Sequence, residues 1–430
     1  MTALGLAKRS FLLFAFALFW MREPLTVGGL PVLPADLVFL FAALLWAAAL
    51  LAGGARVRWS AGFWPLATYW VALAISALFS SDPRTSALKL ATEVYLMALP
   101  VLTYNLVETP ADLRRLFSYS LCGAAIVAVM GTGTLLLFPF FGGHSFLAWP
   151  LHHFGTLPPG PYPRLQLTFD YPAMMANYLA LALMMVILAQ RLGWIGTRLA
   201  LLLGGGILVS ALFALTPGFG GLLVMLGVWI WNRNRRTALG GAALTLAVAA
   251  GVLEVAVASV TPILHRTAPF VIHVPGLALP LAPSVRLLAW IDAARNFIAH
   301  PLVGRGIGVD AVHVPYASPE GGFGIVTDAH DMFLSLAAQA GIVGVVGIAA
   351  LVIYAFRRMA RGNDVVFGLA LAFLSGLVVQ GLVGSFEDAR HLWLAYGLLL
   401  VAARLEKQGA VPDAGVEPAT FGLQNRCSTD

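Results

Sequence analysis

Charged residues and cysteines are scarce in this chain of 430 residues. Only 11% of the residues are Asp, Glu, Lys or Arg, whereas soluble domains average about a quarter. The two cysteines, Cys122 and Cys427, allow neither a disulfide framework nor a Cys-x-x-Cys site. No His-Glu-x-x-His or comparable ligand spacing occurs, so we expect no dedicated metal site. These absences argue against an ordinary soluble enzyme.

Apolar sequence, in contrast, is abundant, at 60% of the residues. A helix that crosses a bilayer needs about 20 mostly apolar residues, and such stretches recur from end to end. The sequence therefore predicts an all-α polytopic integral membrane protein with about twelve transmembrane helices. Their approximate apolar centres are Phe11–Trp20, Leu37–Ala52, Phe63–Phe79, Ala87–Val107, Leu116–Phe138, Tyr171–Gln190, Leu199–Leu215, Gly220–Trp231, Ala238–Ala258, Met332–Tyr354, Val365–Val383 and Leu392–Ala403.

The distribution of Lys and Arg predicts the orientation. With both termini in the cytoplasm, sixteen basic residues up to Lys407 lie on the inner side and nine on the outer side, as the positive-inside rule requires. Lys8 and Arg9 ahead of an apolar run resemble a signal peptide. No small-residue cleavage site follows, so we interpret the run as an uncleaved first span. The net charge of +6 is then a topology signal, and nucleic acid is not an expected partner.

Two predicted outer loops are much longer than the other connections, at about residues 139–170 and 259–331. Long loops in a compact protein are usually functional or disordered, and these two are too rich in Trp, Phe and Leu for disorder. All nine histidines fall on the predicted outer side. Because histidine exchanges protons near neutral pH, we expect any chemistry on that side.

The larger loop contains a predicted helix in "SVRLLAWIDAARNFIAH", with Ser284 as its N-cap and Pro301 as its stop. Arg295 has a carboxylate partner three residues earlier, Asp292, whereas Arg286 has no acid three or four residues on. Arg286 is thus available for an external anion, and phosphate matches its planar fork. On this argument alone, contact with lipid headgroups is an equally good interpretation. The glycines that follow, in "HPLVGRGIG", predict a tight, close-packed turn.

An acid–histidine–acid cluster precedes the predicted span that begins at Met332. It consists of Asp328, His330 and Asp331, in "TDAHDMFLSL". Taken alone, a loop histidine beside two aspartates is more often a solvated, hydrogen-bonded cluster than a catalyst. Its order in the chain after Arg164 and Arg286 reverses that judgement.

Three blocks, in this order, resemble segments of a known family. They are "RLQLTFDYPAMMANYLALAL", "RLLAWIDAARNFIAHPLVGRGIG" and "DAHDMFLSLAAQAGIVGVVG". They are similar to the Arg-x-x-x-x-Phe-x-x-Pro-Asn, Arg…Trp…His/Asn-Pro-Leu-x-Gly-x-Gly-x-Gly and His-Asn-x-Phe/Tyr-Leu-x-x-x-x-Glu-x-Gly segments of the O-antigen ligase and polymerase superfamily of bacterial envelope glycosyltransferases. The resemblance covers mainly residues 164–347, and the third block is the most specific.

This resemblance implies an undecaprenyl-diphosphate-linked glycan as donor and a hydroxyl on lipid A core or on another glycan as acceptor. By matching motif, Arg164 and Arg286 would bind the lipid diphosphate, and His330 would orient or deprotonate the acceptor hydroxyl. Two guanidiniums on the leaving diphosphate replace a metal. The resemblance therefore implies an inverting, metal-independent transfer without a cofactor at the outer face of the bacterial inner membrane. Supporting roles are expected for Asp328, Asp331, Arg305 and His300.

The chain departs from the family pattern at four places. The Asn after the histidine is Asp331, the Glu is Gln339, the Pro-Asn is Pro172-Ala173, and "TPGFGG" stands where a Ser-Arg-Gly element is often found. These departures leave the fold expectation intact. The glycan, the acceptor and the choice between ligase and polymerase stay open.

A transporter or flippase for lipid-linked or small substrates is the alternative. It would need acids or broken helices near mid-membrane, ideally repeated in the two halves, whereas the polar residues gather outside the predicted spans. The last residues, "GVEPATFGLQNRCSTD", are unlike the rest and resemble the product of a reading frame that runs antisense across a transfer-RNA gene. We therefore expect one membrane domain over residues 1–408 and a disordered, dispensable tail over residues 409–430.

Overall fold

The computed structural model describes residues 2–22, 25–27, 30–142, 145–151, 163–216, 218–234, 260–262, 281–283, 285–317 and 323–410. Most of these residues are helical. Five helices are long and apolar enough to cross a membrane: α2 (Pro34–Leu51), α4 (Pro83–Leu106), α5 (Pro110–Phe141), α7 (Pro172–Arg191) and α12 (Met332–Arg361). The predicted class, a helical membrane protein, is confirmed at this level.

The remaining elements are shorter or, in the case of α14 (Arg390–Lys407), carry more charged residues. The other helices are α1 (Ala3–Ala17), α3 (Phe63–Leu78), α6 (Ser145–Ala148), α8 (Thr197–Leu212), α9 (Gly218–Asn234), α11 (Val285–Ala299), α13 (Asp364–Leu374), a π-helix η1 (Ser375–Val379) and α14. Three antiparallel hairpins pair β1 (Leu25–Val27) with β2 (Leu30–Val32), β3 (Val260–Pro262) with β4 (Leu281–Pro283), and β5 (Val314–Ala317) with β6 (Phe323–Val326). The sequence analysis predicted no strands, because such short segments carry almost no alternation signal.

A helix lies over each predicted span except the ninth, Ala238–Ala258, which falls outside the described residues. The first helix begins eight residues earlier than the predicted apolar centre. Thr2 starts it, because its side-chain oxygen accepts a hydrogen bond from the backbone N–H of Gly5 at 3.2 Å. The number of membrane crossings and the layout of the loops remain predictions. The tail beyond Ala410 also lies outside the described residues.

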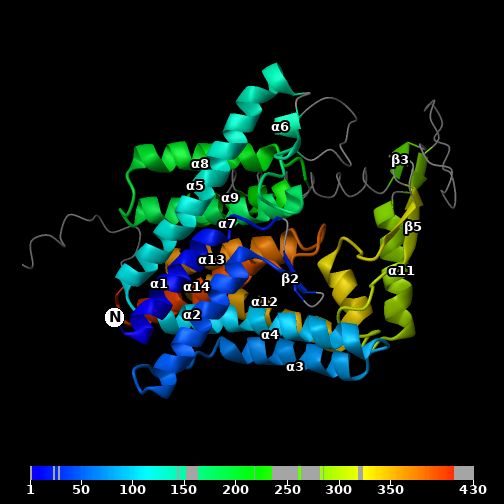
Figure 1. Ribbon diagram of the computed structural model, residues 1–430, viewed down its shortest axis with the longest axis horizontal. Helices are drawn as coiled ribbons and strands as arrows, with labels where there is room; N and C mark the ends of the chain where they lie inside the picture. Colours follow the sequence, from blue (N-terminus) through cyan, green and yellow to red (C-terminus); the bar gives the residue numbers. More distant parts are fainter. Residues whose placement is uncertain are drawn as a thin grey trace, which may run out of the picture.

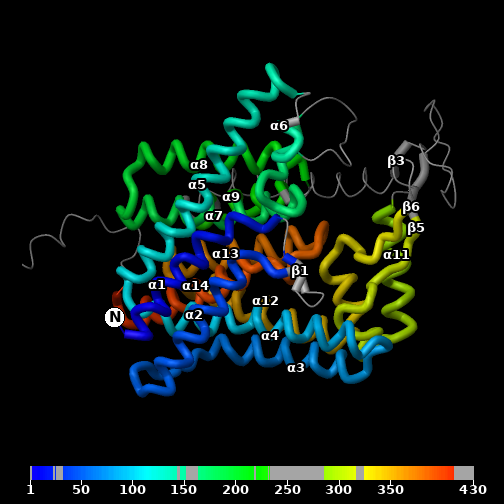
Figure 2. Tube along the Cα trace, viewed as in Figure 1, coloured from blue at the N-terminus to red at the C-terminus, as the bar shows by residue number. Residues whose placement is uncertain are grey.

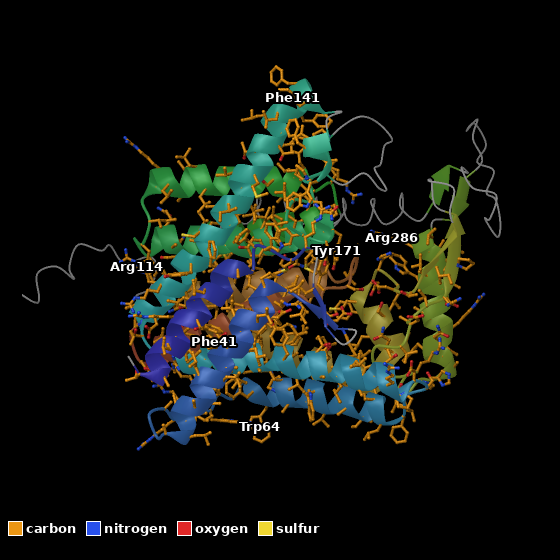
Figure 3. All side chains as sticks on the ribbon, in the orientation of Figure 1. Phe41, Trp64, Arg114, Phe141, Tyr171 and Arg286 are labelled. Atoms are coloured by element: carbon orange, nitrogen blue, oxygen red, sulfur yellow. The ribbon has the colours of Figure 1, made fainter. Side chains whose placement is uncertain are left out.

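The helices run side by side, and α11 crosses one end of the bundle (Figure 1). We call this the α11 end, and the opposite end, where the chain starts, the N-terminal end (Figure 2). Arg114 and Arg286, predicted to lie on opposite sides of the membrane, are at these two ends (Figure 3). The predicted orientation places the α11 end outside the cell.

Helix α7 is at the centre of the bundle and is the most buried of the five long apolar helices. Its Asn177 donates to the carbonyl of Gly376 in η1 at 3.0 Å and lies 2.8 Å from Nε2 of His391 in α14. The π-helix helps to free the Gly376 carbonyl for this contact. His391, one of the nine histidines predicted to lie on the outer side, is fully buried in the helical core.

Helix α12 is broken at Gly341, whose φ of 62° and ψ of −159° are not helical. The break frees backbone groups, and the chain after α11 binds them. The N–H groups of Ile342 and Val343 donate to the carbonyls of Pro301 and Leu302 at 2.9 and 3.3 Å. Arg305 donates its N–H to the carbonyl of Ala338 on the other side of the break, at 3.1 Å.

The glycine-rich segment forms a tight turn, as the sequence predicted, and it fits against this break. Gly304, Gly306 and Gly308 all have positive φ angles. An added Cβ on Gly304 would overlap the backbone of Gln339. The side-chain oxygen of Gln339 accepts a hydrogen bond from the backbone N–H of Gly308 at 3.2 Å. The turn therefore holds α11, α12 and the α3–α4 connection together, since Ser81 also bonds to the Arg305 carbonyl at 2.8 Å.

We predict that Gly341→Ala destabilises the protein. The backbone conformation alone costs roughly 1–3 kcal/mol for a residue with a side chain, and an added Cβ would overlap the carbonyl of Leu302. Thermal unfolding in detergent measures the loss. Gly205→Ala in α8, where nothing lies within 4 Å of an added Cβ, is the matched control and should not lower the melting temperature. Equal melting temperatures for the two variants would contradict a structural role for the break.

Candidate functional site

His330 lies at the α11 end, immediately before α12. Its φ of 53° is left-handed, which is uncommon for a residue with a side chain. The side chain is 47% exposed, and its Nδ1 lies 3.6 Å from a carboxylate oxygen of Asp328. Backbone strain of this kind often marks functional sites. Here it presents an imidazole to solvent with a carboxylate behind it.

Asp328 is fixed by two hydroxyl groups. One of its oxygens accepts hydrogen bonds from the side chains of Ser335 at 2.6 Å and Ser385 at 2.8 Å. The other oxygen is the one that faces His330. Ser335 also accepts a hydrogen bond from the backbone N–H of Ala329 at 3.2 Å. The carboxylate is therefore oriented before any ligand binds.

Asp331 has a structural role. Its side chain accepts hydrogen bonds from the backbone N–H groups of Phe333 and Leu334, both at 2.9 Å, which makes it the N-cap of α12. Burial raises the pKa of its carboxyl group, against the lowering effect of these two hydrogen bonds. The carboxylate is turned toward the helix and is not paired with His330.

The charge of Arg286, in the first turn of α11, reaches His330. Burial lowers the pKa of His330, Asp328 opposes this effect, and the Arg286 cation lowers the pKa further. His330 is thus favoured in its neutral form, in which one ring nitrogen can accept a proton. Arg286 has an interaction of its own. The structure accordingly brings together His330, Asp328 and Arg286.

The other predicted site residues lie apart from this group. Arg164 donates from Nε to the carbonyl of Ala214, between α8 and α9, at 3.1 Å. Arg305 is joined through its backbone to α12 and to Ser81. His300 is exposed beyond the last turn of α11, about 21 Å along the helix from Arg286 at 1.5 Å per residue.

The predicted helix in the larger loop is present as α11, but its expected ion pair and its expected buried face are both absent. Asp292 accepts a hydrogen bond from the backbone N–H of His313 at 2.8 Å, and no ion pair with Arg295 forms. The helical spacing of Leu287, Ile291, Ala294 and Ile298 predicts that they form the buried face, but the buried residues of α11 are Ala289 and Ala293, and Ile298 is 74% exposed. Small residues allow α11 to approach its neighbours closely, and that contact decides which face is buried. Ser284 falls outside the described residues.

Two groups that the sequence analysis did not assign to the site lie beside Asp328. The phenol of Tyr171 donates to the carbonyl of Ser385 at 3.1 Å, and burial, followed by nearby carboxylates that include Asp328, raises its pKa. Burial raises the pKa of Glu387 to about 7, with Lys89 opposing and Asp388 and Asp328 adding to the rise. Glu387 can therefore hold a proton near neutral pH. No local sequence signal joins these distant segments.

Asp388 in the turn before α14 and Arg390 at the start of that helix form ion pairs with other helices. Lys89 of α4 binds Asp388, with 2.6 Å between Nζ and a carboxylate oxygen, and also lies 3.4 Å from Glu93. Arg390 donates two hydrogen bonds to the carboxylate of Asp36 in α2, at 2.5 and 2.7 Å. Asp388 and Arg390 are thus each paired with a different helix, which fixes the turn against the bundle.

No group of three or more His, Cys, Asp or Glu side chains in the described part of the chain is placed to hold a metal ion. A pocket of about 210 Å³ lies at the N-terminal end and contains none of the predicted site residues.

No protein-family model matches the chain, and a search of curated proteins found no match. The function is therefore argued from the site.

We predict that the two neighbours of His330 shift its pKa in opposite directions. Removing the cation in Arg286→Gln should raise the pKa, and removing the carboxylate in Asp328→Asn should lower it, starting from a value below the usual ~6.5. Diethyl pyrocarbonate modifies neutral imidazole, so the modification rate of the His330 peptide against pH, read by mass spectrometry, reports this pKa. An unchanged midpoint in Arg286→Gln would show that the two groups are not neighbours.

We also predict that Asp331→Asn keeps the stability of the protein, because Asn and Asp are equally good N-caps. Asp331→Ala removes both hydrogen bonds to α12 and should cost about 1 kcal/mol. Thermal unfolding of the two variants in the same detergent makes the comparison. If Asp331→Asn were as unstable as Asp331→Ala, the stabilisation would come from the negative charge of Asp331 and not from its hydrogen bonds to α12.

Proposed function

We propose that this protein is a membrane glycosyltransferase of the O-antigen ligase or polymerase type. The donor is a glycan on undecaprenyl diphosphate, and the acceptor is a hydroxyl of lipid A core or of another glycan. The observation that carries the proposal is the group of His330, Asp328 and Arg286 at one end of an apolar helical bundle. It sets a base that favours its neutral form within electrostatic reach of a cation, at the end of a bundle whose helices can lie in a bilayer.

In the proposed reaction, the acceptor oxygen attacks the anomeric carbon of the donor sugar, and its proton passes to His330. The bond from that carbon to the diphosphate breaks, so the anomeric configuration inverts. Arg286 stabilises the charge that develops on the leaving diphosphate. Asp328, held by Ser335 and Ser385, orients the imidazole and favours the imidazolium that forms. Arg164 is proposed as a second cation for the lipid diphosphate.

The broken helix α12 bears on the alternative, a transporter or flippase. Transporter sites are built from helices broken near mid-membrane. In α12 the part after the break, residues 342–361, has 20 residues and is about 30 Å long, which is enough to cross the hydrocarbon core. The break therefore lies toward the α11 end of the helix. This position favours a surface site over a central one.

We predict that the purified protein releases free undecaprenyl diphosphate from a lipid-diphosphate glycan. His330→Ala and Arg286→Ala should each lower the rate by at least about a hundredfold, as expected for loss of a general base or of a charge-stabilising group. The acceptor product and free lipid diphosphate, both measured by mass spectrometry, should appear in equal amounts.

Arg295→Ala is the matched control, because Arg295 lies exposed on the same helix as Arg286 and has no role in the proposed reaction. Its rate should equal that of the unmodified protein. Transfer that survives in His330→Ala would reject this residue as the base. Movement of a lipid-linked substrate across proteoliposomes without any transfer, with several donors, would favour the transporter.

A further inference from the structure

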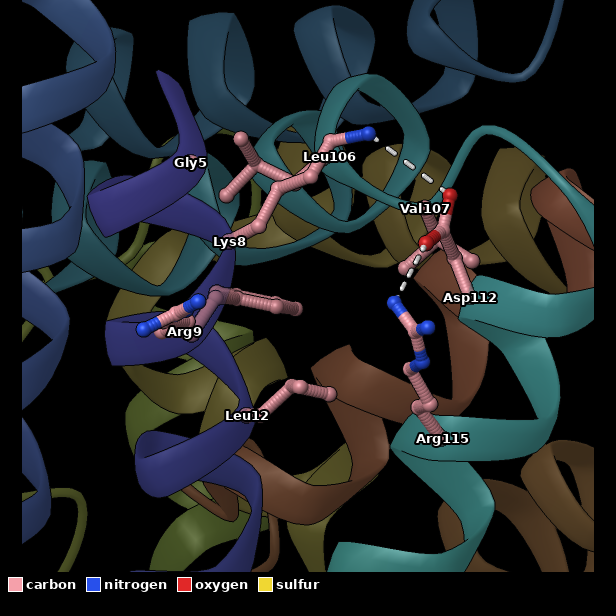
Figure 4. A pocket seen from close by; sticks show the side chains of 9 residues that line it. Gly5, Lys8, Arg9, Leu12, Leu106, Val107, Asp112 and Arg115 are labelled. Atoms are coloured by element: carbon pink, nitrogen blue, oxygen red, sulfur yellow. Dashed lines mark ion pairs between the residues drawn. The ribbon is translucent and has the colours of Figure 1, made fainter. Parts of the chain in front are cut away.

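A pocket at the N-terminal end has no part in the proposed reaction. It has a volume of about 210 Å³ and lies between α1, the end of α4 and the start of α5. Figure 4 shows Lys8 and Arg115 reaching Asp112 from different helices around its opening. Apolar side chains, Leu12 and Val107 among them, also line it. The lining of the pocket thus combines cationic side chains with an apolar surface.

The charges around the pocket do not balance. Lys8 lies 3.1 Å from Glu108 and 3.6 Å from Asp112. Glu108 is shared with Arg58, at 2.9 Å. Arg115 approaches Asp112 only to 3.9 Å and is 69% exposed, so this contact holds it weakly. With Arg9, which also lines the pocket, four cations surround two carboxylates.

The depth of the pocket matches the edge of a bilayer. Lys8 and Arg9 lie five and six residues after the start of α1, and Arg115 lies five residues after the start of α5. At 1.5 Å per residue these cations are about 8–9 Å from the helix ends. Each headgroup layer of a bilayer is roughly 5–8 Å thick. With the helix ends at the bilayer surface, the cations would lie at the boundary between headgroups and hydrocarbon, and the apolar lining would lie beside the acyl chains.

We propose that this pocket binds the phosphate of an anionic phospholipid, with Arg9 and Arg115 as its main ligands and the start of an acyl chain against Leu12. The surplus of positive charge selects an anionic over a zwitterionic headgroup. The apolar base selects a lipid over a free phosphate ion. Basic pockets between helix ends are suited to such headgroups. The site is independent of the glycosyltransferase proposal and lies at the opposite end of the bundle.

Native mass spectrometry of the full chain in detergent tests this site. Phosphatidylglycerol should give a specific adduct, and phosphatidylcholine with the same acyl chains should bind much more weakly. Arg115→Gln and Arg9→Gln should each weaken the adduct about fivefold, as expected for one cation near a phosphate. Arg114→Gln is the matched control. Arg114 is the neighbour of Arg115 on α5 and equally charged, but it does not line the pocket, so its adduct should be unchanged.

Leu12→Trp fills the apolar part and keeps every charge, so it should also lose the adduct. If that variant fails to fold, the comparison of Arg115→Gln with Arg114→Gln still decides. Equal binding in those two variants, or equal binding of the two lipids, would overturn the proposal. Displacement of the lipid by millimolar inorganic phosphate would also overturn it, because the site would then recognise a free ion.

Discussion

The hydrogen bonding of the chain after α11 to the broken turn of α12 is the constraint on which the rest of the α11 end depends. Backbone N–H and C=O groups near a bilayer have little water to bind, so a break in an apolar helix is stable only if protein groups satisfy it. Pro301 and Leu302 accept from one side of the break, and Arg305 and Gly306 donate to the other. These bonds hold the chain after α11 against α12, and at the same end of the bundle Arg286 lies within electrostatic reach of His330.

The helix positions could be predicted from the sequence because an apolar stretch of about 20 residues sets its own length in a bilayer. The break at Gly341 could not. A single glycine in an apolar helix is ordinary, and only the loop that binds the freed groups distinguishes this one. The three glycines of that loop did predict a tight turn, but not that the turn would meet α12 at Gln339. The local sequence pattern therefore predicts the helices and the turn, whereas their packing against one another depends on long-range hydrogen bonds.

In the candidate site, too, some features could be predicted from the sequence and others could not. The order of Arg286 and His330 along the chain indicated that they belong together, and the structure places them within electrostatic reach. Asp331 was grouped with the histidine, yet it caps α12. Because Asn caps a helix equally well, the departure from the family's usual Asn changes little in this role. Arg164 contacts the connection between α8 and α9, so its place at the lipid diphosphate rests on the resemblance.

The ion pairs of the turn before α14 connect the site to the membrane helices. Lys89 and Asp36 lie on α4 and α2 and bind Asp388 and Arg390, and Ser385 in the same turn orients Asp328. A surface ion pair contributes little, but the Arg390–Asp36 pair is largely buried and bidentate, a geometry that fixes orientation. The carboxylate behind His330 is therefore held by a turn that two helices fix. Such a rigid arrangement supports the proposed reaction, in which a base and a cation would have to keep their places while a long lipid-linked substrate moves through.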